Sequence, residues 1–205
     1  VYSLGDDFTD VERNTLEETV NFIVEVCDVV VGVLEPFYSD DDLGRATSIA
    51  ALALKSRVLL YAASDLFNDP SWAGGYSYTN LIAVSPGDRN IRWQAAAVAA
   101  KQVIDEFTGS LDNNYRGLFR SYNSPEIILV RRAGSTNSFE IMNYPAGFDL
   151  AQGGTGPSQN LVDAYEMQDG SEFDWNNPVH SMAPYSNRDP RLSMTVISNN
   201  SVFEG

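Results

Sequence analysis

The feature that most constrains the fold is a helical pattern from residue 45 to residue 67, with no proline or glycine inside it. Apolar residues in this segment, among them Ile49, Leu52, Leu59 and Phe67, lie broadly on one side of a helix. Alanines are frequent along it, so the helix is slender and a neighbouring helix can approach closely. The segment therefore predicts a long helix that packs against at least one other helix.

Two further segments have the same periodicity. Apolar residues from Leu16 to Leu34 recur at gaps of three and four, and Thr15 followed by Glu18 fits a capping box at the start of that helix. A third helix is expected from about Arg92 to Phe107, with Trp93 on its apolar stripe and therefore in the core. Two small-residue helices joined by a loop are similar to a tetratricopeptide-type unit, although the consensus of that repeat is absent and no second copy is found.

The rest of the chain is richer in loops. Residues 68–90 are rich in Gly, Ser, Tyr and Pro, and long loops of this kind in compact folds are often functional. Beyond Gly109 the pattern predicts only short elements. These are helices at Tyr115–Tyr122 and Asn160–Met167, an extended segment at Glu126–Val130, a loop over 133–156, and a strand at Ser193–Ile197. The predicted fold class is mostly α, a tetratricopeptide-like helical part with a loop-rich, irregular part and few short strands.

Charge and composition exclude several functions. Thirteen Lys+Arg against 28 Asp+Glu give a net charge of −15, which repels phosphate backbones and anionic membrane surfaces, so nucleic-acid binding is not expected. Neutral ligands such as sugars are compatible with that charge. Cys27 is the only cysteine and lies on an apolar helix face, which predicts a small buried side chain and excludes an intrachain disulfide. With a single histidine, His180, the usual zinc sites are not expected either.

Five motif blocks occur in order along the chain. The longest is the helix that starts near Gly44-Arg45-Ala46-Thr47 and continues as AALALKSRVLLYAAS from Ala50 to Ser64. The other four are a W-x-x-AA helix at Trp93–Asp105, Glu126-Ile127-Ile128, the block PSQNLVDAYEM at Pro157–Met167 with Gly170, and NRDPRL at Asn187–Leu192. Each block is short, but together with Arg13-Asn14-Thr15 upstream they span nearly the whole chain. In this order they closely resemble the motif blocks of the SusD/RagB family.

The resemblance implies a fold, a function and a location. Members of the family are non-catalytic, lipid-anchored proteins of the bacterial outer membrane, exposed at the cell surface. They bind oligosaccharides or other nutrients and deliver them to a SusC-like TonB-dependent transporter. They are two to three times longer than this chain, so residues 1–205 are expected to be an internal fragment of a single SusD-like domain. Residues 1–110 would form its helical part, and residues 111–205 its loop-rich part near the ligand site.

Sugar binding favours exposed aromatic rings with amide or carboxylate groups nearby, because the rings stack on the apolar face of a sugar and the polar groups bind its hydroxyls. Loop residues of these types are the candidates for ligand contact. They are Trp72, Tyr76, Tyr78, Asn143, Tyr144, Phe148, Asp149 and Trp175.

Acidic residues offer two alternatives. Asp163 and Glu166 could be the paired carboxylates of a helical glycoside hydrolase, although they lie in a block that the family uses without catalysis. Asp40, Asp41 and Asp42 could hold calcium, but they lack the glycine and the distal glutamate of an EF-hand loop. We expect no catalytic residue, no metal and no cofactor. A helical scaffold that binds only proteins is the second rival function.

Overall fold

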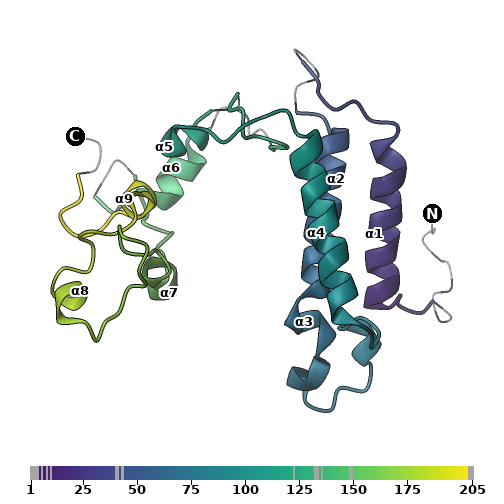
Figure 1. Cartoon of the computed structure of the whole chain (residues 1–205). Helices are drawn as coiled ribbons and strands as arrows, with labels where there is room; N and C mark the ends of the chain where they lie inside the picture. Colours follow the sequence, from purple (N-terminus) through teal and green to yellow (C-terminus); the bar gives the residue numbers. More distant parts are fainter. Residues whose placement is uncertain are drawn as a thin grey trace. The chain divides into compact units, whose positions relative to one another are not determined.

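The computed structural model describes residues 11–39, 42, 44–121, 123–131, 134, 136–147 and 150–202, together with residues 5, 7 and 9. The chain divides into two compact units, which are described separately below. The first contains residues 1–109 and 127–131, and the second contains residues 110–126 and 132–205. The described regular elements of both units are helical, and the long helices that the periodicity predicted lie in the first unit (Figure 1).

Three long helices form the first unit: α1 (Leu16–Val31), α2 (Ser48–Ala63) and α4 (Arg89–Glu106). The predicted capping box starts α1. The backbone N–H of Glu18 donates to Thr15 Oγ1 at 3.1 Å, and the N–H of Thr15 donates to Glu18 Oε2 at 2.8 Å. This reciprocal pair satisfies two amide groups that a helix end would otherwise leave without partners.

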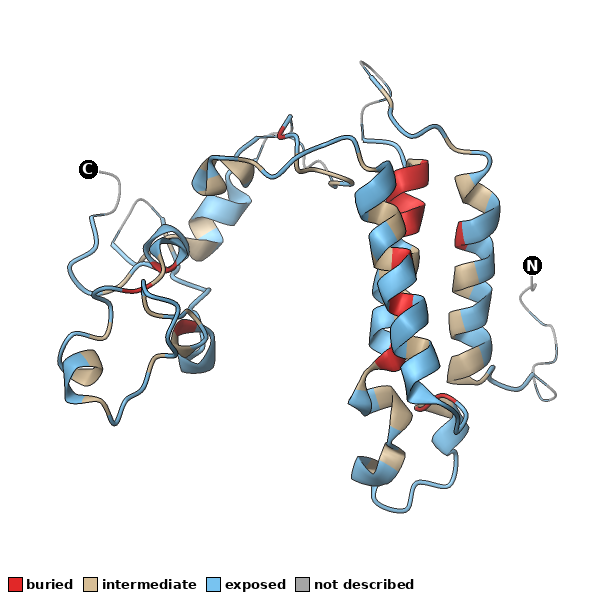
Figure 2. Ribbon diagram, in the orientation of Figure 1, coloured by how far each residue is buried: buried red, intermediate tan, exposed pale blue. Residues whose placement is uncertain are grey.

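The central helix is α2, which packs against both α1 and α4. Its buried residues include Ala50, Ala51 and Ala63, and the buried residues of α4 are Ala96 and Ala99. Figure 2 shows that buried residues of this unit gather mainly on α2 and along α4. Small side chains at the contact let the two helix backbones approach, which confirms the interpretation of the alanine-rich pattern.

The segment expected to be one helix from residue 45 to 67 is divided in two. Thr47 caps the start of α2 by accepting the N–H of Ala50 at 3.1 Å, so the helix begins at Ser48. At Ser64 the backbone becomes extended, and a short helix α3 (Asp65–Asn68) follows. The Asn68 amide donates to the carbonyls of Ala62 (2.7 Å) and Ser64 (2.8 Å), which gives the end of α2 polar partners.

The segment between α3 and α4 has more structure than its composition predicted. It contains two 3₁₀ turns, η2 (Pro70–Ala73) and η3 (Thr79–Leu81). The Arg92 guanidinium on α4 holds both ends of the segment, because it donates to Asn68 Oδ1 at 2.7 Å and to the Ser85 carbonyl at 2.5 Å. Trp93, expected in the core, is instead 40% exposed, with the Arg89 guanidinium carbon 5.9 Å from its ring centre.

Short helices joined by loops form the second unit. They are α5 (Tyr115–Leu118), α6 (Ser138–Asn143), α7 (Gln159–Asp163), α8 (Pro178–Met182) and α9 (Pro190–Thr195). A small core joins α7 to α9 through Val162, Leu192 and Val196, with Tyr165 packed against it. Outside the helices, Met167 and Arg188 form a single antiparallel β-bridge.

Several predictions for the part of the chain beyond Gly109 are wrong in detail. The expected strand at Ser193–Ile197 lies largely in α9, because Asp189 caps that helix and Pro190 starts it. Residues 133–156, expected to be a loop, contain α6. Glu126–Val130 forms no strand in the part of the chain that is described, and the helices predicted at residues 115 and 160 are shorter than expected.

Candidate functional site

Arg188 organises the second unit. Its side chain is only 6% exposed and donates to three backbone carbonyls, those of Pro184 (2.7 Å), Val162 (2.7 Å) and Tyr165 (2.6 Å). Burial lowers the pKa of the guanidinium from its usual value, which is so high that the group remains charged at neutral pH. Arg188 thus links the end of α7 to the turn that precedes α9, and its role is structural.

An aromatic cluster surrounds that arginine. The Phe173 ring lies 4.1 Å from the Arg188 guanidinium carbon, and it also stacks on His180 with ring centres 5.6 Å apart. The ring of Trp175 meets Phe173 edge to face, at 5.0 Å between centres and an interplanar angle of 83°. Edge-to-face packing against Phe173 therefore helps to hold the Trp175 ring in place.

Trp175 is the predicted ligand residue that is best fixed in place. Its indole N–H donates to Asp163 Oδ2 at 3.0 Å, yet the side chain remains 48% exposed. Hydrogen bonds from Trp175 and Gln159 lower the pKa of the Asp163 carboxyl. A half-exposed aromatic ring that is held at its polar end can stack on a ligand with little loss of side-chain entropy.

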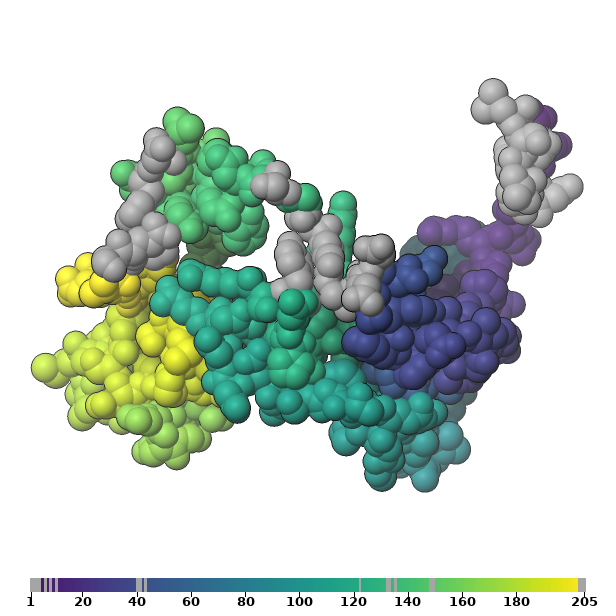
Figure 3. Space-filling view, turned by 90° about the horizontal axis from the view of Figure 1, so that it is seen from above, coloured from purple at the N-terminus to yellow at the C-terminus, as the bar shows by residue number. Residues whose placement is uncertain are grey.

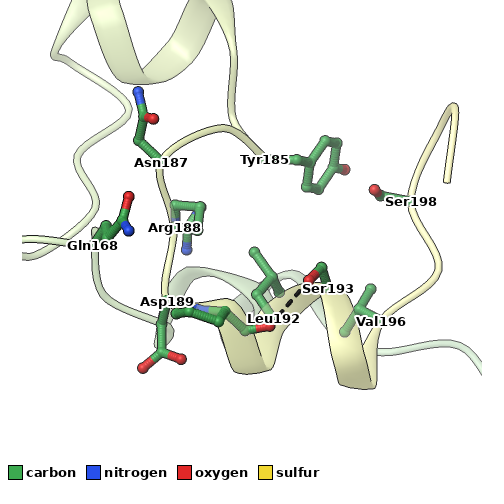
Figure 4. A pocket seen from close by; sticks show the side chains of 10 residues that line it. Gln168, Tyr185, Asn187, Arg188, Asp189, Leu192, Ser193, Val196 and Ser198 are labelled. Atoms are coloured by element: carbon green, nitrogen blue, oxygen red, sulfur yellow. Dashed lines mark hydrogen bonds between the residues drawn. The ribbon is translucent and has the colours of Figure 1, made fainter.

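Next to Arg188 lies a polar hollow of about 180 Å³ (Figure 4). Figure 4 shows Gln168 and Asn187 to one side of Arg188, and Tyr185 and Ser198 to the other. Asp189 also lines the hollow and holds Arg191, whose Nε lies 2.9 Å and 3.0 Å from the two carboxylate oxygens. These hydrogen bonds lower the pKa of Asp189 to about 2.

A second, larger hollow is lined by residues of α5 and α9. The two helices contact each other directly, and Figure 3 shows the teal-green surface near α5 beside the yellow surface near α9. The volume of the hollow is about 390 Å³. Aromatic, basic, hydroxyl and apolar side chains line it: Tyr115, Arg116, Phe119, Arg120, Ser193, Met194, Thr195, Val196, Ile197, Ser201 and Val202.

The predicted residues at α6 serve partly to hold their own loop. The Asn143 amide donates to the Phe139 carbonyl at 2.7 Å, and its oxygen accepts a hydrogen bond from the Thr155 hydroxyl. The Tyr144 carbonyl accepts the N–H of Gly153 at 2.9 Å. Both side chains are half-buried. Phe148 and Asp149 lie outside the described residues.

The other three predicted residues belong to the first unit. Trp72 lies in η2, donates its indole N–H to the Leu66 carbonyl at 3.0 Å and is 58% exposed. Tyr76 and Tyr78 pack edge to face with ring centres 5.9 Å apart, and both are exposed. The left-handed backbone at Gly74 (φ +49°) turns the chain between Trp72 and this tyrosine pair.

Among the described residues, no cluster of His, Cys, Asp or Glu is arranged to hold a metal ion. Asp42 forms an ion pair with Arg45 at 3.1 Å, whereas Asp40 and Asp41 lie outside the described residues. None of the described helices combines the length and the apolar character needed to cross a bilayer.

No protein-family model and no curated protein matches the sequence. Among solved structures, the chain is similar to a SusD-like protein from Bacteroides fragilis, with a TM-score of 0.68 over 94% of this chain and 24% sequence identity. The chain has a SusD-like fold. It spans 36% of the length of that SusD-like protein. The fold that the motif blocks implied is therefore confirmed.

Within the SusD-like fold, sequence reasoning missed the hollow between α5 and α9. A signal for it was present, because an aromatic–arginine pair occurs twice, four residues apart, as Tyr115-Arg116 and Phe119-Arg120. In a helical turn this spacing places like residues next to each other. No comparable pattern in the sequence indicated the aromatic cluster around Phe173, since its members come from separate loops and a short helix.

Proposed function

We propose that the protein containing this chain is a non-catalytic protein of the bacterial cell surface that binds oligosaccharides or related nutrients. It would be anchored in the outer membrane by a lipid and would pass its ligand to a SusC-like TonB-dependent transporter. The SusD-like fold over 94% of the chain carries this proposal. The exposed aromatic side chains supply the chemistry for binding.

Trp175 illustrates that chemistry. Its indole N–H is already bound to Asp163, so the ring face is what remains for a ligand. Stacking of a sugar on such a face requires no charge on the protein, and it is compatible with a chain whose net charge is −15. Trp72, with its N–H bound to the Leu66 carbonyl, offers a second ring of the same type.

A glycoside hydrolase would need different carboxyl chemistry. Its general acid must keep its proton near neutral pH, which requires a raised pKa. Among the described residues, each carboxyl whose pKa departs from its ordinary value is lowered, and this includes Asp163. The Asp163 carboxylate already accepts hydrogen bonds from Trp175 and from Gln159 at 2.7 Å. This arrangement favours a structural carboxylate over a catalytic one.

The proposal is tested by screening the intact protein against an oligosaccharide array and measuring the affinity of each hit by calorimetry. Trp175→Ala, Trp72→Ala and Tyr144→Ala are compared with Tyr61→Ala, which removes an exposed aromatic ring from α2. A ring in the binding site should weaken binding about tenfold or more, because aromatic side chains are frequent binding hot spots. Tyr61→Ala should bind as the parent does.

The array separates the rival functions. Failure to bind any oligosaccharide would refute the proposal and favour a scaffold that binds only proteins, whereas release of shortened sugars would indicate a hydrolase. If a sugar binds and all three loop variants bind it as the parent does, the proposed aromatic residues are wrong. Co-purification of the intact protein with an outer-membrane transporter tests the delivery step separately.

A further inference from the structure

The hollow between α5 and α9 combines two aromatic rings with two arginines. Tyr115 and Phe119 pack edge to face, with ring centres 5.5 Å apart and an interplanar angle of 80°. The Tyr115 hydroxyl lies 3.4 Å from Thr195 Oγ1 on α9, which fixes one ring of the pair against the opposite wall. Phe119 is 74% exposed, so its ring is available to a ligand.

The charge of this hollow is opposite to that of the chain. Acidic residues outnumber basic ones by 28 to 13 in the whole sequence, yet the lining holds Arg116 and Arg120 and no acidic residue. Among the described residues, neither guanidinium has a hydrogen-bond or ion-pair partner. Arg188 and Arg191, in contrast, are occupied by backbone carbonyls and by Asp189.

We propose that this hollow binds an acidic sugar unit, one that carries a carboxylate or a sulfate group on its ring. The inference rests on the proposed function and specifies a substrate class for it. Arg116 and Arg120 would bind the anionic group, since the guanidinium fork matches carboxylate and sulfate oxygens with paired hydrogen bonds. The exposed ring of Phe119 would stack on the apolar face of the same sugar.

The volume of the hollow and the net charge of the chain both agree with this assignment. The volume of about 390 Å³ lies within the range of small-molecule sites. Because the chain as a whole carries a net charge of −15, it repels an anionic sugar on average, and the arginine pair supplies a local attraction. The field of two exposed arginines is screened by salt, so binding should weaken as the ionic strength rises.

The test measures the affinity of the intact protein for three probes of equal length by calorimetry. The probes are a galacturonic acid trisaccharide, its carboxyl-reduced neutral counterpart and a sulfated galactose trisaccharide. Arg116→Gln combined with Arg120→Gln is compared with Arg57→Gln combined with Arg131→Gln. The control pair removes the same charge from two exposed arginines outside the hollow.

The variant in the hollow should lose about tenfold or more in affinity for an acidic probe, because hydrogen bonds to charged groups are among the strong ones. The control pair should lose less than about threefold, through long-range charge alone. Arg116→Lys with Arg120→Lys keeps the charge without the fork and should fall between them. The carboxylate and sulfate probes show which anion is preferred.

Each outcome bears on the inference. If the protein binds neutral oligosaccharides but neither acidic probe, or if the variants in the hollow bind an acidic probe as the control pair does, the inference is refuted and the proposed function stands. If no oligosaccharide binds at all, both are refuted. Equal thermal melting of the two double variants would establish that a loss of affinity arises in the hollow and not from misfolding.

Discussion

Replacing Arg188 with methionine should destabilise the core of the second unit. The substitution keeps a long side chain but removes the guanidinium, which donates to the carbonyls of Val162, Tyr165 and Pro184 at 2.6–2.7 Å. It also removes the contact with the Phe173 ring. The connections between α7 and the turn before α9 would then depend on the small apolar core and on a few backbone hydrogen bonds.

The expected loss follows from these contacts. Three hydrogen bonds from a charged donor contribute about 5–9 kcal/mol in total, at about 1.5–3 kcal/mol each. Methionine carries no charge that must be desolvated on folding, which recovers several kcal/mol, and its side chain replaces part of the packing. A net destabilisation of about 3 kcal/mol remains, because the Val162 carbonyl lies in a buried environment and loses its charged donor.

Native-state hydrogen exchange measures this loss where it occurs. The amides of Gln168 and Asp189 report directly, because they donate to the carbonyls of Asn187 (2.7 Å) and Glu166 (2.9 Å) across the same junction. A loss of about 3 kcal/mol lowers their protection about a hundredfold. Arg191→Ala is the matched control. The Arg191 side chain is 60% exposed, so solvent screens its ion pair with Asp189, and protection should fall less than about fivefold.

Equal protection in Arg188→Met and Arg191→Ala would refute the reasoning, since it would mean that the buried guanidinium contributes no more than a surface ion pair. Arg188→Lys separates charge from geometry. One ammonium group cannot reach three carbonyls in the same arrangement, so this variant should recover only part of the lost protection.

Two further outcomes follow from displaced pKa values. Cys27 is 3% exposed, and burial is the main factor that raises the pKa of its thiol. A thiol reagent at neutral pH should therefore modify it only at the rate of unfolding. Complete labelling of the folded protein within minutes would contradict this. Asp189, whose pKa is about 2, stabilises the fold fully above about pH 4 and progressively less as the pH falls toward 2. Asp189→Asn should therefore flatten the dependence of the unfolding midpoint on pH between about 4 and 2, and an unchanged slope would exclude this carboxyl as its source.

Local patterns predicted the long helices because their causes are local. The capping box at Thr15 and Glu18 acts within one turn, and the alanines of α2 and α4 indicate a close helix contact whatever the neighbour is. The Ser193–Ile197 prediction failed for the opposite reason. Its β-branched residues favour a strand locally, but burial of Leu192 and Val196 on the same side of one turn, against Val162, favours the helix.

The same contrast between local and non-local causes applies to the candidate site. Exposure of Trp72, Tyr76 and Trp175 could be inferred from their glycine- and serine-rich or polar surroundings, and the structure places all three at the surface. What holds Trp175 could not be inferred, because Asp163 lies on α7 and Phe173 on a later loop. The expectation that Trp93 lies in the core was wrong, because the packed face of α4 is the one that carries Ala96 and Ala99.

The arginines of the second unit divide into those of a motif block and those of the proposed binding site. Arg188 and Arg191 belong to the NRDPR block that carries the family resemblance, and both form hydrogen bonds within the fold. Arg116 and Arg120 belong to no such block, and their charges face a hollow without acidic residues. A guanidinium that is already paired inside the protein has few free N–H donors for a ligand. An unpaired guanidinium beside an exposed ring can supply both hydrogen bonds and a stacking surface. Specificity for a ligand should therefore reside in the residues between the motif blocks, where substitutions can change the preferred ligand without disturbing the fold.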